Sequence, residues 1–272
     1  MTRGVLSLFS AIIVAAAPSL RAQLTINQLE MSVTPSATAR VMATFVVHNS
    51  GAQAAQGALT SEDWDRSESG ENRFVPSGSS ARSCGALTSF FPTAFRVEPG
   101  GDQTIRVAVE RAPGLTKECW DIIFVEAVST KGLPKNSGLQ YIVRTGVKVY
   151  VQPAGLKRAA SIMKMAVESA GSRIASSPRT SLLQPVKQQI AIRFSNDGDV
   201  HLFARGQIEI RRLDNSVMMQ IPIPEFPVLS GAVRQLVLDV PPTLLPGTYI
   251  ALALIEFGGA EIAAGQLELN VR

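Results

Sequence analysis

The segment 139–153 constrains the fold of this chain more than any other, because it is a long run of residues that favour β-strands. It runs Leu-Gln-Tyr-Ile-Val-Arg-Thr-Gly-Val-Lys-Val-Tyr-Val-Gln and ends in a proline, which cannot donate to a sheet ladder. In a pleated strand, Leu139, Tyr141 and Val143 point to one side. At a sheet edge, such a strand would offer unpaired backbone groups, an apolar row and the positive charge of Lys148. These features predict capture of an extended peptide by strand addition.

The first 22 residues have the pattern of a cleavable secretory signal peptide. Arg3 provides a basic start, an apolar run extends from Val5 to Ala17, and cleavage falls most simply after Ala22. An uncleaved membrane anchor is the alternative, but the apolar run is shorter than a bilayer-spanning helix needs. We therefore expect an exported protein, located in the periplasm or, as a second option, on the cell surface.

Length and charge narrow the possibilities for the mature chain. Removing 22 of the 272 residues leaves 250, enough for two domains that each have their own core. The formal charge falls from +4 to +2, because two arginines leave and no acidic residue does. The basic residues are scattered, so the sequence shows no footprint for nucleic acid or for an anionic membrane surface.

Cys84 and Cys119 are the two cysteines of the chain. An even number of cysteines in an exported protein predicts one disulfide, with two free thiols as the alternative. A single pair also argues against a zinc site built on cysteines.

Short strands separated by turns predict an all-β chain. In the first half we expect strands at 40–48, 95–98, 103–110, 119–128 and 139–151. In the second half we expect them at 190–194, 205–212, 217–221, 233–240, 248–257 and 261–271. Gly, Pro and Asn turns at regular intervals between them favour two immunoglobulin-like sandwiches in tandem. An Asn-x-Gly turn follows an apolar strand in each half, at Asn49 and again at Asn196.

The segment 154–188 is less regular. Its part from Ala159 to Ala170 has a composition that permits a helix, but alternating apolar residues also fit a strand, and we expect a strand followed by an excursion. The predicted organisation is therefore a signal peptide at 1–22, a first domain at 23–153, a linker with the first strand region of the second domain at 154–188, and a second domain at 189–272.

Catalytic motifs are missing from the sequence. The two histidines, His48 and His201, fall beside turns in different predicted domains, where a polar residue at a strand end is the simplest interpretation. No nucleophile elbow, zinc-protease motif or phosphate-binding loop occurs. We therefore predict no enzyme, no catalytic residue, no metal and no cofactor.

The acidic segment 62–71 is the one remaining candidate for a metal site. Asp63, Asp65 and Glu68 could gather around calcium, which binds several oxygen ligands. The spacing is not that of an EF-hand, and nearby arginines can neutralise the carboxylates. We expect instead a solvated hairpin with Trp64 turned inward.

Three motifs together resemble the periplasmic pilus (fimbrial) chaperones of the chaperone–usher type. The segment 146–153, Gly-Val-Lys-Val-Tyr-Val-Gln-Pro, is similar to the strand that closes the first domain of that family. The segment 91–100, followed by Thr-Ile-Arg-Val at 104–107, resembles a proline-glycine motif of the family, and Trp120 leads an apolar strand in the expected place. The resemblance covers about residues 24–153 and is confined to architecture and to Phe-Ser-Asn at 194–196 in the rest.

The resemblance implies two immunoglobulin-like domains in a boomerang arrangement and a role in pilus assembly. It implies that Lys148 anchors the C-terminal carboxylate of an exported, pilin-like subunit, a role that suits a compact ammonium group. It also implies that Leu139, Tyr141 and Val143 fill the apolar groove of an incomplete pilin. An outer-membrane usher is the further partner that the family implies.

The chain also departs from the family. These chaperones carry an arginine on the first strand that joins the lysine at the carboxylate, and the matching position here is Glu30 or Met31. Arg40 and Arg144 are the nearest substitutes in sequence. The cysteine pair is not a usual mark of the family's first domain.

Two other functions compete with that of a chaperone. One is a structural or adhesive surface protein in which 139–151 is ordinary sheet, and the other is a secreted carbohydrate- or metal-binding module. A chaperone would leave Leu139, Tyr141 and Val143 exposed in the free protein, whereas a structural role would bury them.

Overall fold

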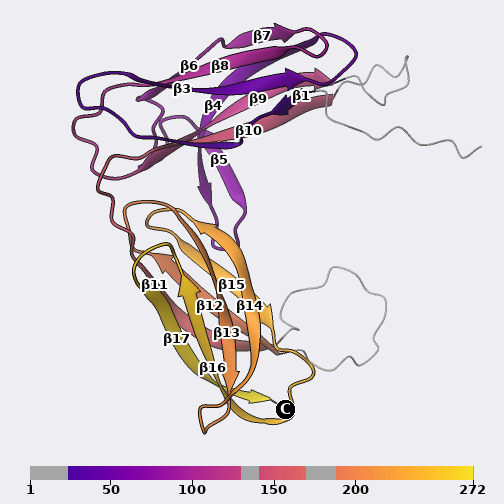
Figure 1. The fold of residues 1–272 in the computed structure, drawn as a ribbon, viewed down its shortest axis with the longest axis vertical. Coiled ribbons are helices and arrows are strands. Elements are labelled where there is room, and N and C mark those ends of the chain that lie inside the picture. Colours follow the sequence, from indigo (N-terminus) through magenta and orange to yellow (C-terminus); the bar gives the residue numbers. More distant parts are fainter. Residues whose placement is uncertain (1–23, 130–140, 170–187, 272) are drawn as a thin grey trace, which may run out of the picture.

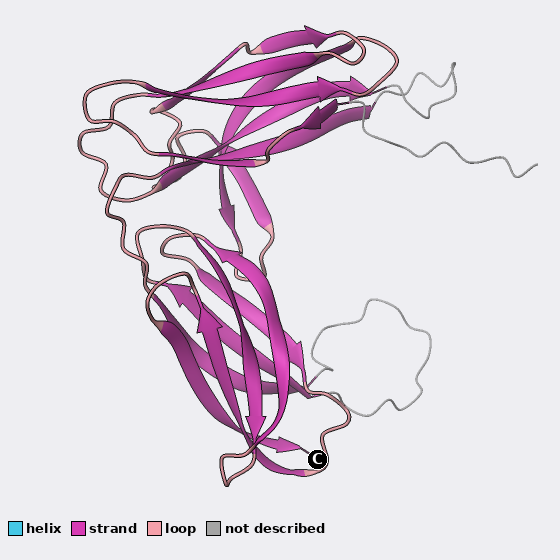
Figure 2. Cartoon of the chain, in the orientation of Figure 1, coloured by secondary structure: helices cyan, strands magenta, loops and turns pink. Residues whose placement is uncertain are grey.

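The computed structural model describes residues 24–129, 141–169 and 188–271, although the side chains of 128, 129 and 141 are left out. This part of the chain consists of strands and loops without a helix (Figure 2), so it contains no helix that could span a membrane. Figure 1 shows two β-sandwiches set at an angle to each other. The predicted all-β fold with two immunoglobulin-like sandwiches is confirmed.

The first sandwich packs two sheets face to face. One sheet has the order β1 (Leu24–Ile26), β3 (Val41–Asn49), β8 (Asp102–Val109) and β6 (Thr88–Phe91). The other has the order β2 (Glu30–Val33), β10 (Tyr141–Val151), β9 (Cys119–Ser129), β4 (Ala55–Arg66) and β5 (Asn72–Pro76), and β7 (Ala94–Val97) also pairs with β4. Strand β2 runs parallel to β10, whereas the other pairs are antiparallel. Fully buried Phe45, Ile105 and Ile123 form the centre of the core between the sheets.

The second sandwich has a three-stranded and a four-stranded sheet. The first contains β11 (Ala160–Ser169), β12 (Gln188–Asn196) and β15 (Val233–Asp239). The second has the order β14 (Val217–Val228), β13 (Leu202–Arg211), β16 (Gly247–Glu256) and β17 (Ile262–Val271). Strand β11 lies in the segment whose composition also permitted a helix. Its Ile162 and Met165 pack against the core of the second sandwich. The limits of the two domains stay predictions.

The disulfide between Cys84 and Cys119 is present, as predicted. It joins the loop before β6 to the first residue of β9, with 5.3 Å between the two Cα atoms. Both cysteines are buried in a small cluster with Val33, Val109 and Val151. The bridge therefore ties the two sheets of the first sandwich at the end where β10 leads into the second sandwich.

The Asn-x-Gly turns play the same part in both sandwiches. The side-chain amide of Asn49 donates to the carbonyls of Gln53 and Val97, and its oxygen accepts from the backbone N–H of Gly51. Asn196 likewise binds the carbonyls of Val200 and Val228 and the N–H of Gly198. Both asparagines are fully buried, and their satisfied amides fix the turn at the end of β3 and of β12.

The acidic segment forms the hairpin between β4 and β5, with Trp64 turned inward and only 1% exposed, as expected. Its carboxylates have separate partners: Asp63 accepts from Ser80 and Ser83, Asp65 pairs with Arg73, and Glu68 pairs with Arg193. Within the described residues, no three His, Cys, Asp or Glu side chains lie close enough to hold a metal ion.

Candidate partner-binding site

Strand β10 is paired along its whole length on one side and along only part of it on the other. Strand β9 matches it from Tyr141 to Val151. Strand β2 matches only the last residues, from Lys148 opposite Glu30 to Val151 opposite Val33. Between Tyr141 and Val147, no strand of the described chain pairs with the second side. This half of β10 is therefore an open sheet edge.

The direction of the backbone groups follows from the two hydrogen bonds that flank β2. The N–H of Lys148 donates to the carbonyl of Leu29 at 2.8 Å, and the N–H of Gln152 donates to that of Val33 at 2.9 Å. Backbone groups alternate in direction along a strand, so residues an even number of positions away point the same way. The N–H and C=O groups of Ile142, Arg144 and Gly146 therefore point toward the open edge.

An apolar row emerges from the core along the same strand. Val147, Val149 and Val151 are fully buried in the first sandwich. Val143 lies on the same face but is 43% exposed, because it is beyond the end of the core cluster. Leu139 and the side chain of Tyr141, the other two predicted groove-filling residues, lie outside the described residues.

Lys148 lies where the open edge ends, and it is bound to an acid. Its Nζ is 2.5 Å from Oε1 of Glu30 and 5.0 Å from the centroid of the Trp64 ring. The lysine side chain is only 18% exposed. The register places Glu30 directly opposite Lys148, whereas Met31 turns into the core. Glu30 thus neutralises the lysine.

The two substitute arginines suggested by the sequence are held elsewhere. Arg40 pairs with Glu110 at 2.6 Å on the other sheet. Arg144 pairs with Glu62 at 2.5 Å and Glu126 at 2.8 Å, and its guanidinium lies 3.4 Å from the Phe124 ring centroid. The structure does not bring either of them to Lys148.

An aromatic cluster lies on the face of the sheet that carries Lys148. It contains Trp64, Trp120, Ile122, Phe124 and Tyr150 from the first sandwich and Leu229 from the second. The indole N–H of Trp120 donates to the carbonyl of Trp64 at 2.7 Å. Burial raises the pKa of Tyr150, so its hydroxyl stays protonated. This shared cluster holds the two sandwiches together beside the site.

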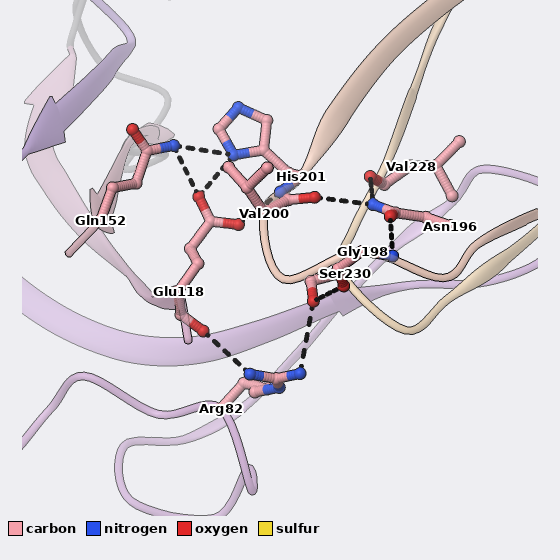
Figure 3. A network of polar contacts seen from close by, with 9 residues as sticks. All are labelled: Arg82, Glu118, Gln152, Asn196, Gly198, Val200, His201, Val228 and Ser230. Atoms are coloured by element: carbon pink, nitrogen blue, oxygen red, sulfur yellow. Dashed lines mark hydrogen bonds and ion pairs between the residues drawn. The ribbon is translucent and has the colours of Figure 1, made fainter. Parts of the chain in front are cut away.

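A buried polar network sets the junction between the sandwiches (Figure 3). Glu118, which is fully buried just before β9, accepts from the backbone N–H of His201 and from the Gln152 amide. The other carboxylate contact is with Nδ1 of His201 at 2.6 Å, and the imidazole stacks on Tyr150 with ring centroids 4.0 Å apart. Arg82 adds a bridge from the carbonyl of Glu118 to the hydroxyl of Ser230.

Sequence reasoning missed this network. His201 does lie beside a strand end, immediately before β13, as expected of a polar turn residue. Its partner Glu118 is far away in the chain and belongs to the other sandwich. No local pattern connects the two residues, so nothing in the sequence marked either as part of a junction.

Comparisons with known proteins identify the fold. No protein-family model matches the sequence, and no curated protein matches it. The crystal structure of the class 5 fimbriae chaperone CfaA has a TM-score of 0.51 and 11% identical residues, and the match covers 92% of this chain and 99% of that one. A chain from a chaperone–tip adhesin complex of CFA/I fimbriae biogenesis has a TM-score of 0.50 and 10% identity, with coverage of 91% and 98%. The predicted likeness to fimbrial chaperones is thus confirmed for the fold.

Proposed function

We propose that this protein is a periplasmic chaperone that binds exported, pilin-like subunits by strand addition along the open edge of β10. The observation that carries the proposal is the unpaired edge between Tyr141 and Val147, which ends at Lys148. An extended segment laid along this edge would satisfy the backbone groups of Ile142, Arg144 and Gly146, and main-chain hydrogen bonds supply affinity in this mode of recognition.

The apolar row adds specificity for an incomplete partner. Val143 is exposed in the free protein and continues a row of fully buried valines. Burial of one such side chain against a partner is worth roughly 1.5–3 kcal/mol. We propose that Val143, together with Tyr141 and Leu139, fills an apolar groove that the unassembled subunit exposes.

The partner class is supported by the similar structures. One of them is described as a chaperone–tip adhesin complex of fimbriae biogenesis. We extend this to the present chain as a proposal: its partner is an exported subunit of a surface appendage, and an outer-membrane usher receives the complex. Export by the signal peptide at 1–22 is part of the same proposal.

The carboxylate anchor takes a modified form in this protein. We assign Lys148 to the C-terminal carboxylate of the partner, in competition with Glu30. The partner carboxylate must displace that of Glu30, since the ammonium group is already paired at 2.5 Å. Charge-assisted hydrogen bonds in a partly desolvated cleft are worth roughly 1.5–3 kcal/mol, so this exchange would weaken the anchor appreciably.

Co-purification from periplasmic extracts tests the lysine and its competitor. The amount of exported subunit that co-purifies, identified by mass spectrometry, should fall several-fold with Lys148→Ala and rise with Glu30→Gln, which keeps the size of the side chain but removes its charge. Arg40→Gln, on the other sheet, is the matched control and should leave the yield unchanged. Equal yields from all variants would refute the assignment of Lys148.

A structural or adhesive surface protein is the competing function. It would use 139–151 as ordinary sheet and bury the predicted groove-filling residues. The exposure of Val143 speaks against it. A wild-type protein that is purified from periplasm without any exported subunit, and is found instead in surface appendages, would favour this alternative.

A further inference from the structure

Three arginines gather where the tip of the β4–β5 hairpin meets the second sandwich. Arg66 belongs to the first sandwich, whereas Arg193 and Arg234 belong to β12 and β15 of the second. Glu68 accepts from Arg193 through its side chain at 2.7 Å and from Arg234 through its backbone carbonyl at 2.6 Å. Within the described residues, no carboxylate pairs with Arg66 or Arg234. The cluster therefore has three positive charges and one paired acid.

One nitrogen of each arginine in this cluster lacks an acceptor. The Nε atoms of Arg66, Arg193 and Arg234 are buried and have no hydrogen-bond partner in the described part of the protein. The same is true of Nε1 of Trp64, whose side chain is 1% exposed. A buried donor without a partner is costly, and more so when it belongs to a charged group. The three arginine residues themselves are only partly buried, so an anion beside their guanidinium groups would offset the charge.

Electrostatics at the cluster favour an anion. Burial lowers the pKa of Arg234, and the nearby charge of Arg66 lowers it further. Guanidinium groups remain charged nevertheless, because their pKa lies far above the physiological range. Two like charges without a counter-ion create a local positive potential that attracts a negatively charged group.

The cluster borders both the proposed carboxylate anchor and solvent. Cζ of Arg66 lies 5.9 Å from the centroid of the Trp64 ring, and Nζ of Lys148 lies 5.0 Å from the same centroid. Arg234 and Ser69 line one end of a groove of about 510 Å³ that follows β14 and β15. A ligand can therefore reach Arg234 from solvent.

We propose that Arg66 and Arg234 form an anion site, with one arginine from each sandwich, and that it takes a carboxylate of the bound exported segment. The pair supplies the positive charge that Lys148 has lost to Glu30. Planar guanidinium groups suit a carboxylate because they present paired N–H donors. The source of the carboxylate rests on the proposed function, whereas the anion site itself does not.

Titration with acetate tests the site without any partner. The Nε–H signals of Arg66 and Arg234 in ¹⁵N-labelled protein at low ionic strength should shift with acetate and stay in place with acetamide, its neutral analogue. Arg66→Gln combined with Arg234→Gln removes both charges while keeping side-chain amides. Since the double variant lacks these two Nε–H groups, the acetate response is followed at the N–H signals of the other residues in the cluster. It should be lost in the double variant and retained in Arg73→Gln, a control on β5 of the same hairpin. Signals that do not respond in the wild type would overturn the site.

Peptides distinguish the source of the carboxylate. Three acetylated peptides that alternate valine with threonine would be compared: one with a free C-terminus, one amidated, and one amidated but containing an internal aspartate. The free acid should bind about tenfold or more tightly than the amide, and the double variant, which keeps Lys148, should lose most of this advantage. Equal binding of the first two peptides would overturn the anchor while strand addition stands. Tighter binding of the aspartate peptide than of the free acid would show that the site prefers a side-chain carboxylate, and it would contradict the proposed role of the C-terminus. If none of the three peptides binds, the result counts against strand addition instead.

Discussion

Glu30 removes the free positive charge of Lys148. The sequence left Glu30 or Met31 as the position that matches the arginine of the resembled family, and the register of β2 with β10 sets Glu30 opposite Lys148. An arginine there would add a charge to that of Lys148, whereas a glutamate cancels it. Lys148 is thus left without excess positive charge beside it, and Arg66, whose guanidinium lies 5.9 Å from the centroid of the Trp64 ring, and Arg234 have no carboxylate partner among the described residues.

Asp121 should make the stability of the first sandwich depend on pH. Its carboxylate is 1% exposed and accepts from the hydroxyl of Thr88 and the N–H of Ile122, and burial raises its pKa from 3.8 to about 6. The folded protein holds this proton more tightly than the unfolded chain does. The stabilisation is therefore complete below about pH 4 and is lost as the pH rises through 6, by about 3 kcal/mol at 1.36 kcal/mol per pKa unit.

Urea unfolding of wild type and Asp121→Asn at pH 4 and pH 7 measures this effect. The asparagine variant does not titrate, so its free energy of unfolding should rise relative to that of the wild type by about 2.4 kcal/mol from pH 4 to pH 7, since an unfolded aspartate is already partly ionised at pH 4. A difference between the two proteins that is the same at both pH values would contradict the raised pKa.

Strand β10 shows what could and could not be predicted from the sequence. Its alternating apolar residues predicted a strand, and the order of the motifs placed it at the end of the first domain. Which side of it stays open depends on how far β2 extends, and that is a long-range pairing with no local signal. Strands β5 and β6 were not predicted either, because they are short and lie among serine- and glycine-rich segments.

Proline substitutions on neighbouring residues separate the two sides of β10. Ile142→Pro removes an N–H that points to the open edge, so it should reduce partner binding at least several-fold while the fold is retained. Val143→Pro removes an N–H that bonds to β9, and it should lower the free energy of unfolding by roughly 3 kcal/mol. Binding assays and urea unfolding of both variants provide the test. Equal loss of stability in the two variants would contradict the assigned direction of the backbone groups.

The junction between the sandwiches is the part of the molecule that sequence patterns could least reveal. Glu118, His201 and Gln152 come from three strand ends, lie far apart in the sequence and meet where the two sandwiches join. The buried Glu118 carboxylate is the common acceptor of all these contacts. We expect it to hold the two sandwiches at a fixed angle, which positions the hairpin of the first against β15 of the second.

Neighbouring substitutions on the same loop test this role. Glu118→Ala leaves the buried donors of His201 and Gln152 without an acceptor and should cost roughly 3–5 kcal/mol of stability, with a broader distribution of interdomain angles in small-angle X-ray scattering. Lys117→Ala removes only an exposed pair with Asp199 at 3.6 Å and should cost less than about 1 kcal/mol. Scattering curves that do not differ between wild type and Glu118→Ala would contradict this role of Glu118.

The central claim is that the open edge of β10 receives a strand from an exported subunit, and residue-resolved hydrogen exchange tests it most directly. In the free protein, the amides of Ile142, Arg144 and Gly146 should exchange fast, while those of Val143, Thr145 and Val147, which face β9, should be protected. In the complex with the co-purified subunit, the first three amides should become protected as well. Protection of these three amides already in the free protein, or fast exchange that persists in the complex, would contradict the claim.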